Sequence, residues 1–276
     1  MIVAACSPRT LENLFRDTLR EAGINQYYFE MANIREHYSW VHSKEKEEAT
    51  RKAKDIIRMS LARAGRLEPL QEFDLPVDKA ALVVGGGIAG MNCALSIANQ
   101  GHEVHLVEKQ SELGGIARRI HSTLEGIDVQ AYLRDLIAKV YKHQLIHVYH
   151  SATIQDATGY VGNFVTTVRS EKGITAIKHG ATILAIGADL HTPTEYLYGQ
   201  DDRVMTHLDL DERIAKCDEK IKSATSIAMI QCVGCRNEER NYCSRVCCSE
   251  SVKNALNLKK LNPQMDVYIL YRDMRT

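Results

Sequence analysis

The chain has 276 residues, of which 45% are hydrophobic and 25% charged, enough apolar material for one large or two modest domains. Lys plus Arg and Asp plus Glu each number 35, so no net charge favours nucleic acid or an anionic membrane surface. No apolar run approaches the roughly 20 residues that span a bilayer, and residues 1–6 lack the basic start of a signal peptide. We therefore expect a cytoplasmic protein with no membrane span and no nucleic-acid partner.

Residues 1–64 are predicted to form a small N-terminal α/β domain. Residues 2–5 are predicted as a buried strand, for which the nearby sequence offers no partner. Ser7 is a suitable N-cap and Pro8 a suitable first helical residue, and Gly23 ends the helix that they begin. Apolar residues recur at helical spacing over residues 44–64, beneath a charged face that we interpret as solvated. Residues 65–79 contain two prolines and no clear period, which predicts a linker.

Strand and helix patterns alternate from residue 80 onward, which predicts an α/β fold with a doubly wound, Rossmann-type sheet. A first, cofactor-binding domain is expected over residues 80–223, and a second, incomplete βαβ unit over residues 224–276. The predicted strands are 80–84, 103–107, 145–149, 182–186, 226–230 and 266–270, the predicted helices are 90–99, 129–141 and 249–261, and a hairpin is expected over 163–178.

A G-x-G-x-x-G motif lies between the first predicted strand and helix of the 80–223 domain. Gly85 permits a tight turn, Gly87 lets the backbone approach a pyrophosphate, and Gly90 allows the helix to pack closely on the strand. The phosphates would meet free N–H groups at the helix N-terminus. Glu108 lies 23 residues past Gly85, where an acid can accept hydrogen bonds from ribose hydroxyls. The motif thus predicts a dinucleotide site at Gly85, Gly87, Ile88, Ala89, Gly90 and Glu108.

Two further segments favour FAD as the dinucleotide. The run from Glu108 and Lys109 to Gly114-Gly115 resembles the extension beside the flavin in flavoproteins with two dinucleotide domains. Ala185-Ile186-Gly187 resembles the short element that returns the chain to FAD in the same superfamily. We therefore add Lys109, Gly115 and Gly187 to the predicted FAD site. In the second βαβ unit, cysteines stand where a second glycine fingerprint would be, so NAD(P)H is not expected to bind there.

Five of the eight cysteines lie within 17 residues, at Cys232, Cys235, Cys243, Cys247 and Cys248. Four thiolates at short spacing can hold a [4Fe–4S] cluster or a structural zinc ion, and Cys232 with Cys235 could form a redox dithiol. Unliganded buried thiols are a fourth interpretation. We favour iron and sulfur because a redox metal near a flavin has a use that zinc lacks.

Several longer segments resemble the A-type subunit of heterodisulfide reductases. They cover nearly the whole chain and include Ala5-Cys-Ser-Pro-Arg9, Phe29-Glu-Met-Ala-Asn-Ile-Arg35, Ser39-Trp-Val-His42, Gly159-Tyr-Val-Gly-Asn-Phe164, Gln231-Cys-Val-Gly234 and Tyr242-Cys-Ser-Arg-Val-Cys-Cys248. The resemblance implies an iron–sulfur flavoprotein with a thioredoxin-reductase-like FAD domain. It also implies an oxidoreductase acting on sulfur groups, which passes electrons from an input protein to subunits of the B and C type. In several such complexes this FAD bifurcates electrons, and a homodimer within a larger complex is expected.

The chain departs from that family in three ways. It has no inserts with Cys-x2-Cys-x2-Cys-x3-Cys-Pro runs, which implies a compact variant or a fragment. Position 235 is commonly Ser in the family but is Cys here, so the implied cluster ligands are Cys232, Cys243, Cys247 and Cys248, with Cys235 and Cys6 as substitutes. The family also continues at both ends, and we expect further sequence or a partner chain to complete the open sheets.

Two other functions are compatible with the residues. A stand-alone NAD(P)H-dependent flavin disulfide reductase would use Cys232 and Cys235 as its dithiol. A catalytically silent assembly module would only dock partners. Iron with acid-labile sulfide would argue against the reductase, and bound flavin against the silent module.

Overall fold

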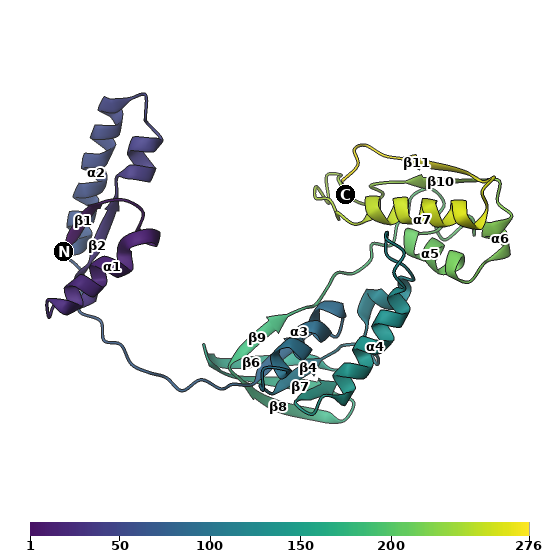
Figure 1. Cartoon of the computed structure of the whole chain (residues 1–276), viewed down its shortest axis with the longest axis horizontal. Coiled ribbons are helices and arrows are strands. Elements are labelled where there is room, and N and C mark those ends of the chain that lie inside the picture. Colours follow the sequence, from purple (N-terminus) through teal and green to yellow (C-terminus); the bar gives the residue numbers. More distant parts are fainter. Residues whose placement is uncertain (276) are drawn as a thin grey trace. The chain divides into compact units, whose positions relative to one another are not determined.

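The computed structural model describes residues 1–275 of the chain, whose elements are labelled in Figure 1. It divides into two compact units, Met1–Asp74 and Leu75–Thr276, which are described separately below. Its α/β architecture confirms the predicted fold class. Within the described residues, no helix is both long and apolar enough to cross a membrane.

The first unit is built on a two-stranded parallel sheet. Its elements are β1 (Ile2–Ala5), α1 (Pro8–Glu21), β2 (Glu30–Asn33), a π-helical segment (Arg35–Trp40) and α2 (Lys46–Ala64). The strand at residues 2–5 does have a partner close in sequence, because β1 pairs in parallel with β2. The expectation that it lacked one was wrong, since β2 carries no clear apolar alternation to reveal it. Buried Leu19, Phe29 and Ala32 form the core between sheet and helices.

This unit continues past the end of α2. Residues 65–74 contain no helix or strand, but the Asn25 side chain donates a hydrogen bond to the Leu70 carbonyl at 2.8 Å. The Tyr27 hydroxyl donates another to the Glu72 carboxylate at 2.7 Å. These contacts attach the segment to the turn that precedes β2.

A four-stranded parallel sheet organises the second unit. Its strands are β3 (Ala81–Val84), β4 (Val104–Val107), β5 (Ile146–Tyr149) and β9 (Ala181–Leu184), in the order β5-β4-β3-β9. β3 pairs with both β4 and β9, so the strand order reverses between β3 and β9. In open α/β sheets, ligands bind outside the carboxyl ends of the strands at such a switch point.

Different elements cover the two faces of this sheet. α3 (Ile88–Ala98) and α4 (Val129–Lys142) pack on one face, in a core that includes Val83, Leu106 and Met91. On the other face, Leu82 and Val107 pack against an antiparallel sheet, which takes the place of the helices expected in a doubly wound fold. Its strands are β6 (Thr153–Tyr160), β7 (Asn163–Ser170) and β8 (Gly173–His179). The predicted hairpin is β7–β8, whereas the exposed strand β6 was not predicted.

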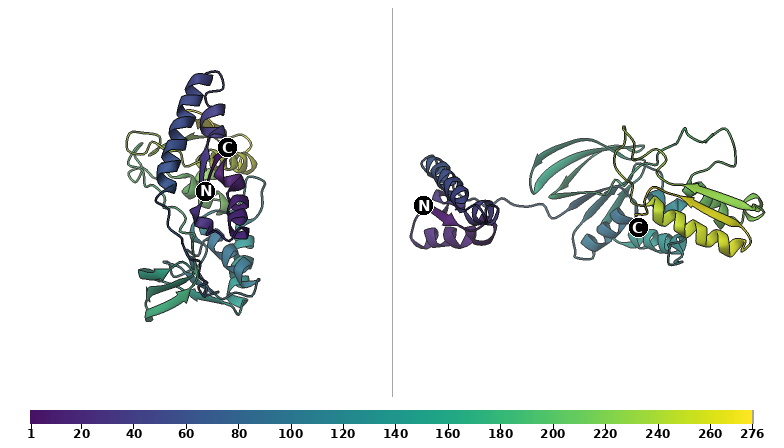
Figure 2. Two further views of the ribbon diagram at one scale, coloured as in Figure 1. Left: turned by 90° about the vertical axis from the view of Figure 1, so that its left-hand side faces the viewer. Right: turned by 90° about the horizontal axis from the view of Figure 1, so that it is seen from above.

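The remaining elements form the second βαβ unit. β10 (Ser226–Ile230) and β11 (Asp266–Leu270) are parallel, and α7 (Cys247–Leu261) lies alongside both in Figures 1 and 2. α5 (His207–Ala215) and α6 (Glu219–Lys222), neither of them predicted, complete its core around Leu210, Met229 and Leu258. Thr276, the last residue of the predicted 224–276 unit, lies outside the described residues.

Candidate functional site

The predicted dinucleotide turn joins the carboxyl end of β3 to the N-terminus of α3. Gly85 has φ +106°, and a Cβ atom there would lie 2.3 Å from the Ala185 carbonyl oxygen. A Cβ on Gly90 would lie 1.9 Å from the carbonyl oxygen of Gly85. Glycine is thus required at these two positions by the protein's own packing, whatever the turn binds.

Gly87 is different, because nothing lies within 4 Å of the position its Cβ would occupy. Its φ of −74° and ψ of −175° are open to any residue, and α3 begins at the next residue without a side-chain cap. Ile88, Ala89 and Gly90 are in the first turn, where backbone N–H groups have no intrahelical acceptor. The turn therefore offers an open cradle with several donors at the positive end of a helix, which suits an anion.

Glu108 lies at the carboxyl end of β4 and is 5% exposed. Its carboxylate accepts hydrogen bonds from the N–H of Gly86 at 2.6 Å and the N–H of Gln110 at 2.8 Å. A carboxylate has about four acceptor positions, so both bonds leave capacity for ribose hydroxyls. The sequence did not reveal that Glu108 also fixes the turn.

The other predicted flavin-site residues converge on this cradle. Gly114 donates a backbone hydrogen bond to Gly86 at 2.8 Å, and a Cβ on Gly115 would lie 3.4 Å from the Gly87 Cα. Gly187 follows Ala185, whose N–H binds the Val84 carbonyl at 2.8 Å. Lys109 lies 3.4 Å from Asp189, two residues beyond Gly187. Segments from three parts of the sequence thus meet at the β3–β9 switch point.

The predicted cluster ligands lie at the carboxyl end of β10 and the start of α7. Cys232 is the second residue after β10, Cys243 is in the intervening loop, and Cys247 and Cys248 are the first residues of α7. Within residues 1–275, no three His, Cys, Asp or Glu side chains have an arrangement that holds a metal ion. The ligand set therefore stays a prediction.

Hydrogen-bond donors surround the sulfur atoms of this loop. The Arg245 N–H donates to Cys243 Sγ at 3.4 Å, Ser244 Oγ to Cys247 Sγ at 3.5 Å, and Arg236 Nη1 to Cys232 Sγ at 3.8 Å. The pKa of Arg236 is raised, first by its hydrogen bond with Asp273 and then by Cys232. Donors of this kind stabilise thiolates and tune the potential of an iron–sulfur cluster.

The cysteine loop also contains strained backbone. Cys232, Arg236 and Arg245 have φ of +63°, +58° and +59°, in the left-handed region that disfavours side chains. Such residues persist only where the surroundings fix them, and they gather at functional sites.

Cys235 and Cys248 differ in surroundings. Burial raises the pKa of the Cys235 thiol, and nearby Cys232, Cys247 and Cys243 raise it further. Cys248 is 3% exposed, and its carbonyl accepts a hydrogen bond from Ser251. The structure thus brings Cys235 close to three of the four predicted ligands.

A direct contact joins the cysteine loop to the loop after β9. Gly234 has φ +70°, and a Cβ there would lie 2.0 Å from Cδ2 of His191. His191 is four residues past Gly187, so the extended chain between them spans at most about 14 Å. The segment that closes the cradle therefore leads directly onto the cysteine loop.

The two arginines after Gly115 have separate partners. Arg118 pairs with Glu112, whereas Arg119 pairs with Asp209 and Glu212 of α5. α5 was not predicted, although Thr206 and Asp209 form a capping box whose spacing marks a helix start.

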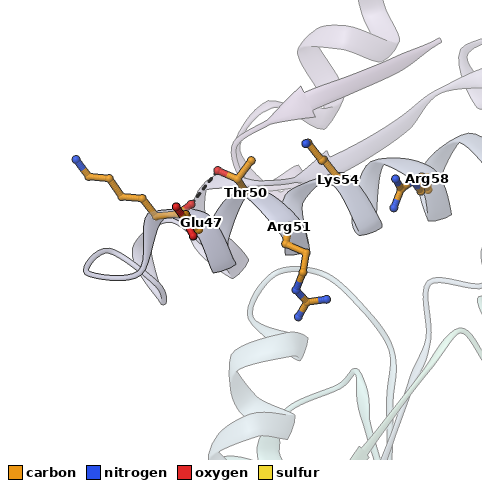
Figure 3. Close-up of a pocket in the computed structure, with 6 residues that line it drawn as sticks. Glu47, Thr50, Arg51, Lys54 and Arg58 are labelled. Atoms are coloured by element: carbon orange, nitrogen blue, oxygen red, sulfur yellow. Dashed lines mark hydrogen bonds between the residues drawn. The ribbon is translucent and has the colours of Figure 1, made fainter.

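A shallow hollow along α2 lies in the first unit (Figure 3). It is lined by Lys46, Glu47, Thr50, Arg51, Lys54 and Arg58. The Arg51 guanidinium holds the pKa of Glu48 at about 2, chiefly through their hydrogen bond. These charges belong to one solvated helix face, as predicted for the start of this helix.

Residues 83–150 match the family of NAD(P)-binding Rossmann-like domains. The chain is 32% identical to the A-type subunit of the H(2):CoB-CoM heterodisulfide,ferredoxin reductase of Methanothermobacter marburgensis, over 100% of this chain and 56% of that protein. It is 33% identical to the second A-type iron-sulfur subunit of the CoB–CoM heterodisulfide reductase of Methanopyrus kandleri, with the same coverage. A crystal structure of L-proline dehydrogenase from P. horikoshii is similar at a TM-score of 0.43 and 18% identity, over 73% of this chain and 37% of that one.

The alignment with each of the two curated relatives covers 366 positions, more than the 276 residues of this chain, so they carry insertions that it lacks. The chain spans about half the length of these relatives. It is therefore homologous along its whole length to the A-type subunits of the heterodisulfide reductase family.

Proposed function

We propose that this chain is an electron-transfer flavoprotein, holding FAD at the β3–α3 turn and a [4Fe–4S] cluster on the cysteine loop. The observation that carries the proposal is the packing of His191 against Gly234. It joins the loop that closes the dinucleotide cradle to the loop that carries the cysteines. Two redox centres built on these loops would be close enough to exchange electrons.

The cradle suits FAD in its shape and its donors. The open space at Gly87 leaves room for a pyrophosphate, and the first turn of α3 supplies N–H groups. Glu108 retains acceptor capacity for the ribose. Gly115 and Gly187 have no side chains, so they leave the space beside the cradle open. Bound FAD would supply one- and two-electron redox chemistry, while these residues bind and orient it.

The cysteine loop suits an iron–sulfur cluster in its donor chemistry. We propose Cys232, Cys243, Cys247 and Cys248 as ligands, with Cys235 as the alternative to one of them. Backbone and side-chain donors already face three of these sulfur atoms. A bound cluster would supply one-electron transfer, with its potential set by such hydrogen bonds and by burial.

The wider role follows from the family. We propose that the chain works in the cytoplasm as an oxidoreductase subunit of a heterodisulfide-reductase-type complex. It would receive electrons from an input protein and pass them to partners of the B and C type, which reduce the heterodisulfide. A homodimer within the complex, and electron bifurcation at FAD, belong to the same proposal.

Anaerobic purification tests the cofactor content. We expect a flavin spectrum with broad iron–sulfur absorbance, and about four iron atoms with matching acid-labile sulfide per chain. An iron-free protein that NADPH reduces would instead support the disulfide reductase at Cys232 and Cys235. A colourless folded protein would exclude both.

Serine variants test the ligand set. C232S, C243S, C247S and C248S should each lose most of the iron, whereas C235S, the matched control in the same loop, should retain it. All five should keep FAD, because the cradle is built on other residues. Loss of iron in C235S together with retention in C248S would assign Cys235 in place of Cys248.

A further inference from the structure

Asp211 of α5 is a buried carboxylate shared by two parts of the second unit. It is 1% exposed. It accepts a hydrogen bond from the backbone N–H of His121 at 2.9 Å, in the segment that follows the 3₁₀ helix Gly115–Arg119. Its other contact is with α7, where the Lys253 ammonium lies 3.1 Å away.

Lys253 is as deeply buried as its partner. Its side chain is 4% exposed, and Glu250, one turn earlier in α7, accepts a hydrogen bond from it at 2.8 Å. Burial raises the pKa of Glu250, and Lys253 opposes this effect. A buried charge that loses its partner is strongly destabilising, so Asp211 and Lys253 hold α5 and α7 in one relative position.

Arg119 forms a second, more exposed set of ion pairs with α5. Its guanidinium donates to Asp209 at 2.7 Å and also to Glu212, and all three side chains are about one-third exposed. These bonds raise the pKa of Arg119, the Glu212 bond most. A further hydrogen bond joins Asn257 of α7 to Ser122 at 3.1 Å.

The two segments that these contacts join, the 3₁₀ helix and α7, each begin at a candidate cofactor site. The 3₁₀ helix begins at Gly115, against Gly87 of the cradle, and α7 begins at Cys247 and Cys248. α5 lies between them and contributes no candidate ligand of its own. The ion pairs of α5 therefore connect the 3₁₀ helix beside the cradle to α7, whose first two residues are candidate cluster ligands.

We propose that Asp211 is a positioning residue, which with Arg119 fixes the cradle relative to α7 and so keeps the flavin-to-cluster separation constant. This inference rests on the proposed function. Asp211 and Arg119 touch neither cofactor site, and act through the 3₁₀ helix on one side and α7 on the other. They should therefore affect electron transfer without affecting cofactor content.

The test uses the full chain, purified without oxygen, and reverses the charge at Arg119. R119E is compared with the charge swap R119E/E212R, and with R213E, which makes the same charge change on α5. Arg213 forms no ion pair among the described residues. Two quantities are measured after flavin and iron assays: hydrogen exchange of the His121 amide, and the rate at which electrons given to the flavin reach the iron.

We expect R119E to keep both cofactors, to exchange the His121 amide about fivefold faster, and to transfer electrons more slowly. The charge swap should restore both values in part, because it re-forms the pair with position 212 while the carboxylate at position 119 still faces Asp209. R213E should leave both values at wild-type level. A second variant, D211A/K253M, removes both buried charges so that neither is stranded, and should show a larger effect of the same kind.

Wild-type values in R119E and in D211A/K253M would overturn the proposal, as would equal effects in R119E and R213E. Faster exchange of the His121 amide with an unchanged electron-transfer rate would show that Asp211 only stabilises the fold. That result would also overturn the proposal. If the wild type holds no flavin or no iron, the proposed function fails, and this inference about electron transfer falls with it.

Discussion

Gly87 and Gly90 belong to one motif, but the structure gives them different reasons to be glycine. At Gly90 the backbone of Gly85 occupies the space that a side chain would need. At Gly87 that space is open and the backbone angles are ordinary. The protein's own fold thus explains Gly90, whereas it leaves Gly87 unexplained, and the proposed FAD would supply the reason.

Alanine substitutions should separate these two reasons. G87A should fold with an unchanged or slightly higher free energy of unfolding, because alanine fits the observed angles. It should bind FAD about 100-fold more weakly, or by about 2.8 kcal/mol, because the methyl group fills the cradle. G90A should instead lower the free energy of unfolding by about 1–3 kcal/mol. Denaturant unfolding and flavin titration measure both, and unchanged flavin affinity in G87A would contradict the assigned cradle.

Among the individual helices, α5 is short, but its N-terminus is stabilised by a capping box. The Thr206 hydroxyl oxygen accepts from the Asp209 N–H at 3.2 Å, and the Asp209 carboxylate accepts from the Thr206 N–H at 2.9 Å. Hydrogen bonds from Thr206 and Arg119 lower the pKa of Asp209 against the opposing effect of burial. The cap therefore keeps Asp209 charged and in place for Arg119.

Removing the cap should destabilise the second unit. We expect T206A to lower the free energy of unfolding by about 1–2 kcal/mol, since the Asp209 N–H loses its acceptor and the Asp209 carboxylate loses the Thr206 hydroxyl. This corresponds to a fall in Tm of a few degrees. T192A, at an exposed loop position, is the control and should leave Tm unchanged. Equal Tm values in both variants would show that the capping box adds no stability.

The elements that sequence predicted best are those with strong local signals. Pro8 and Gly23 marked the ends of α1, and the glycine motif marked β3 and α3. β2 and β6 were missed although their partners lie close in sequence, because neither shows a clear apolar alternation and β6 is exposed along its whole length. The glycines and Glu108 were similarly visible from their spacing. The contacts of Arg119, Asp211 and His191 were not visible, because each joins residues that are distant in the sequence.

Across the whole molecule, three histidines lie away from full solvent exposure: His179 is buried, and His105 and His207 are partly buried. Burial lowers the pKa of His105, His179 and His207, and Lys253 lowers that of His207 further. The unfolded chain protonates these residues near pH 6.5, while the folded chain keeps them neutral to lower pH. Below about pH 6.5 the unfolded state therefore binds more protons, and the free energy of unfolding should fall.

We expect this loss to be measurable between pH 6.5 and pH 5.5, at up to about 1 kcal/mol for each histidine, because the unfolded imidazole is already about half protonated at pH 6.5. Glu250 acts in the opposite direction, because its pKa is raised in the folded state. Glu48 and Asp201, with pKa values of about 2, stay charged throughout this range. Denaturant titrations at pH 7.5, 6.5 and 5.5 measure the slope, and H179Q should reduce it. A free energy of unfolding that rises toward pH 5.5 would contradict the assignment.

The carboxylate of Asp211 has a consequence for how the second unit melts. It accepts a hydrogen bond from the His121 N–H of the Rossmann-like part (residues 83–150), and Arg119 and Ser122 of that part also contact α5 and α7, so neither part can open first without breaking these polar contacts. Calorimetry should therefore record one endotherm for residues 75–276, although this region contains two βαβ units with separate apolar cores.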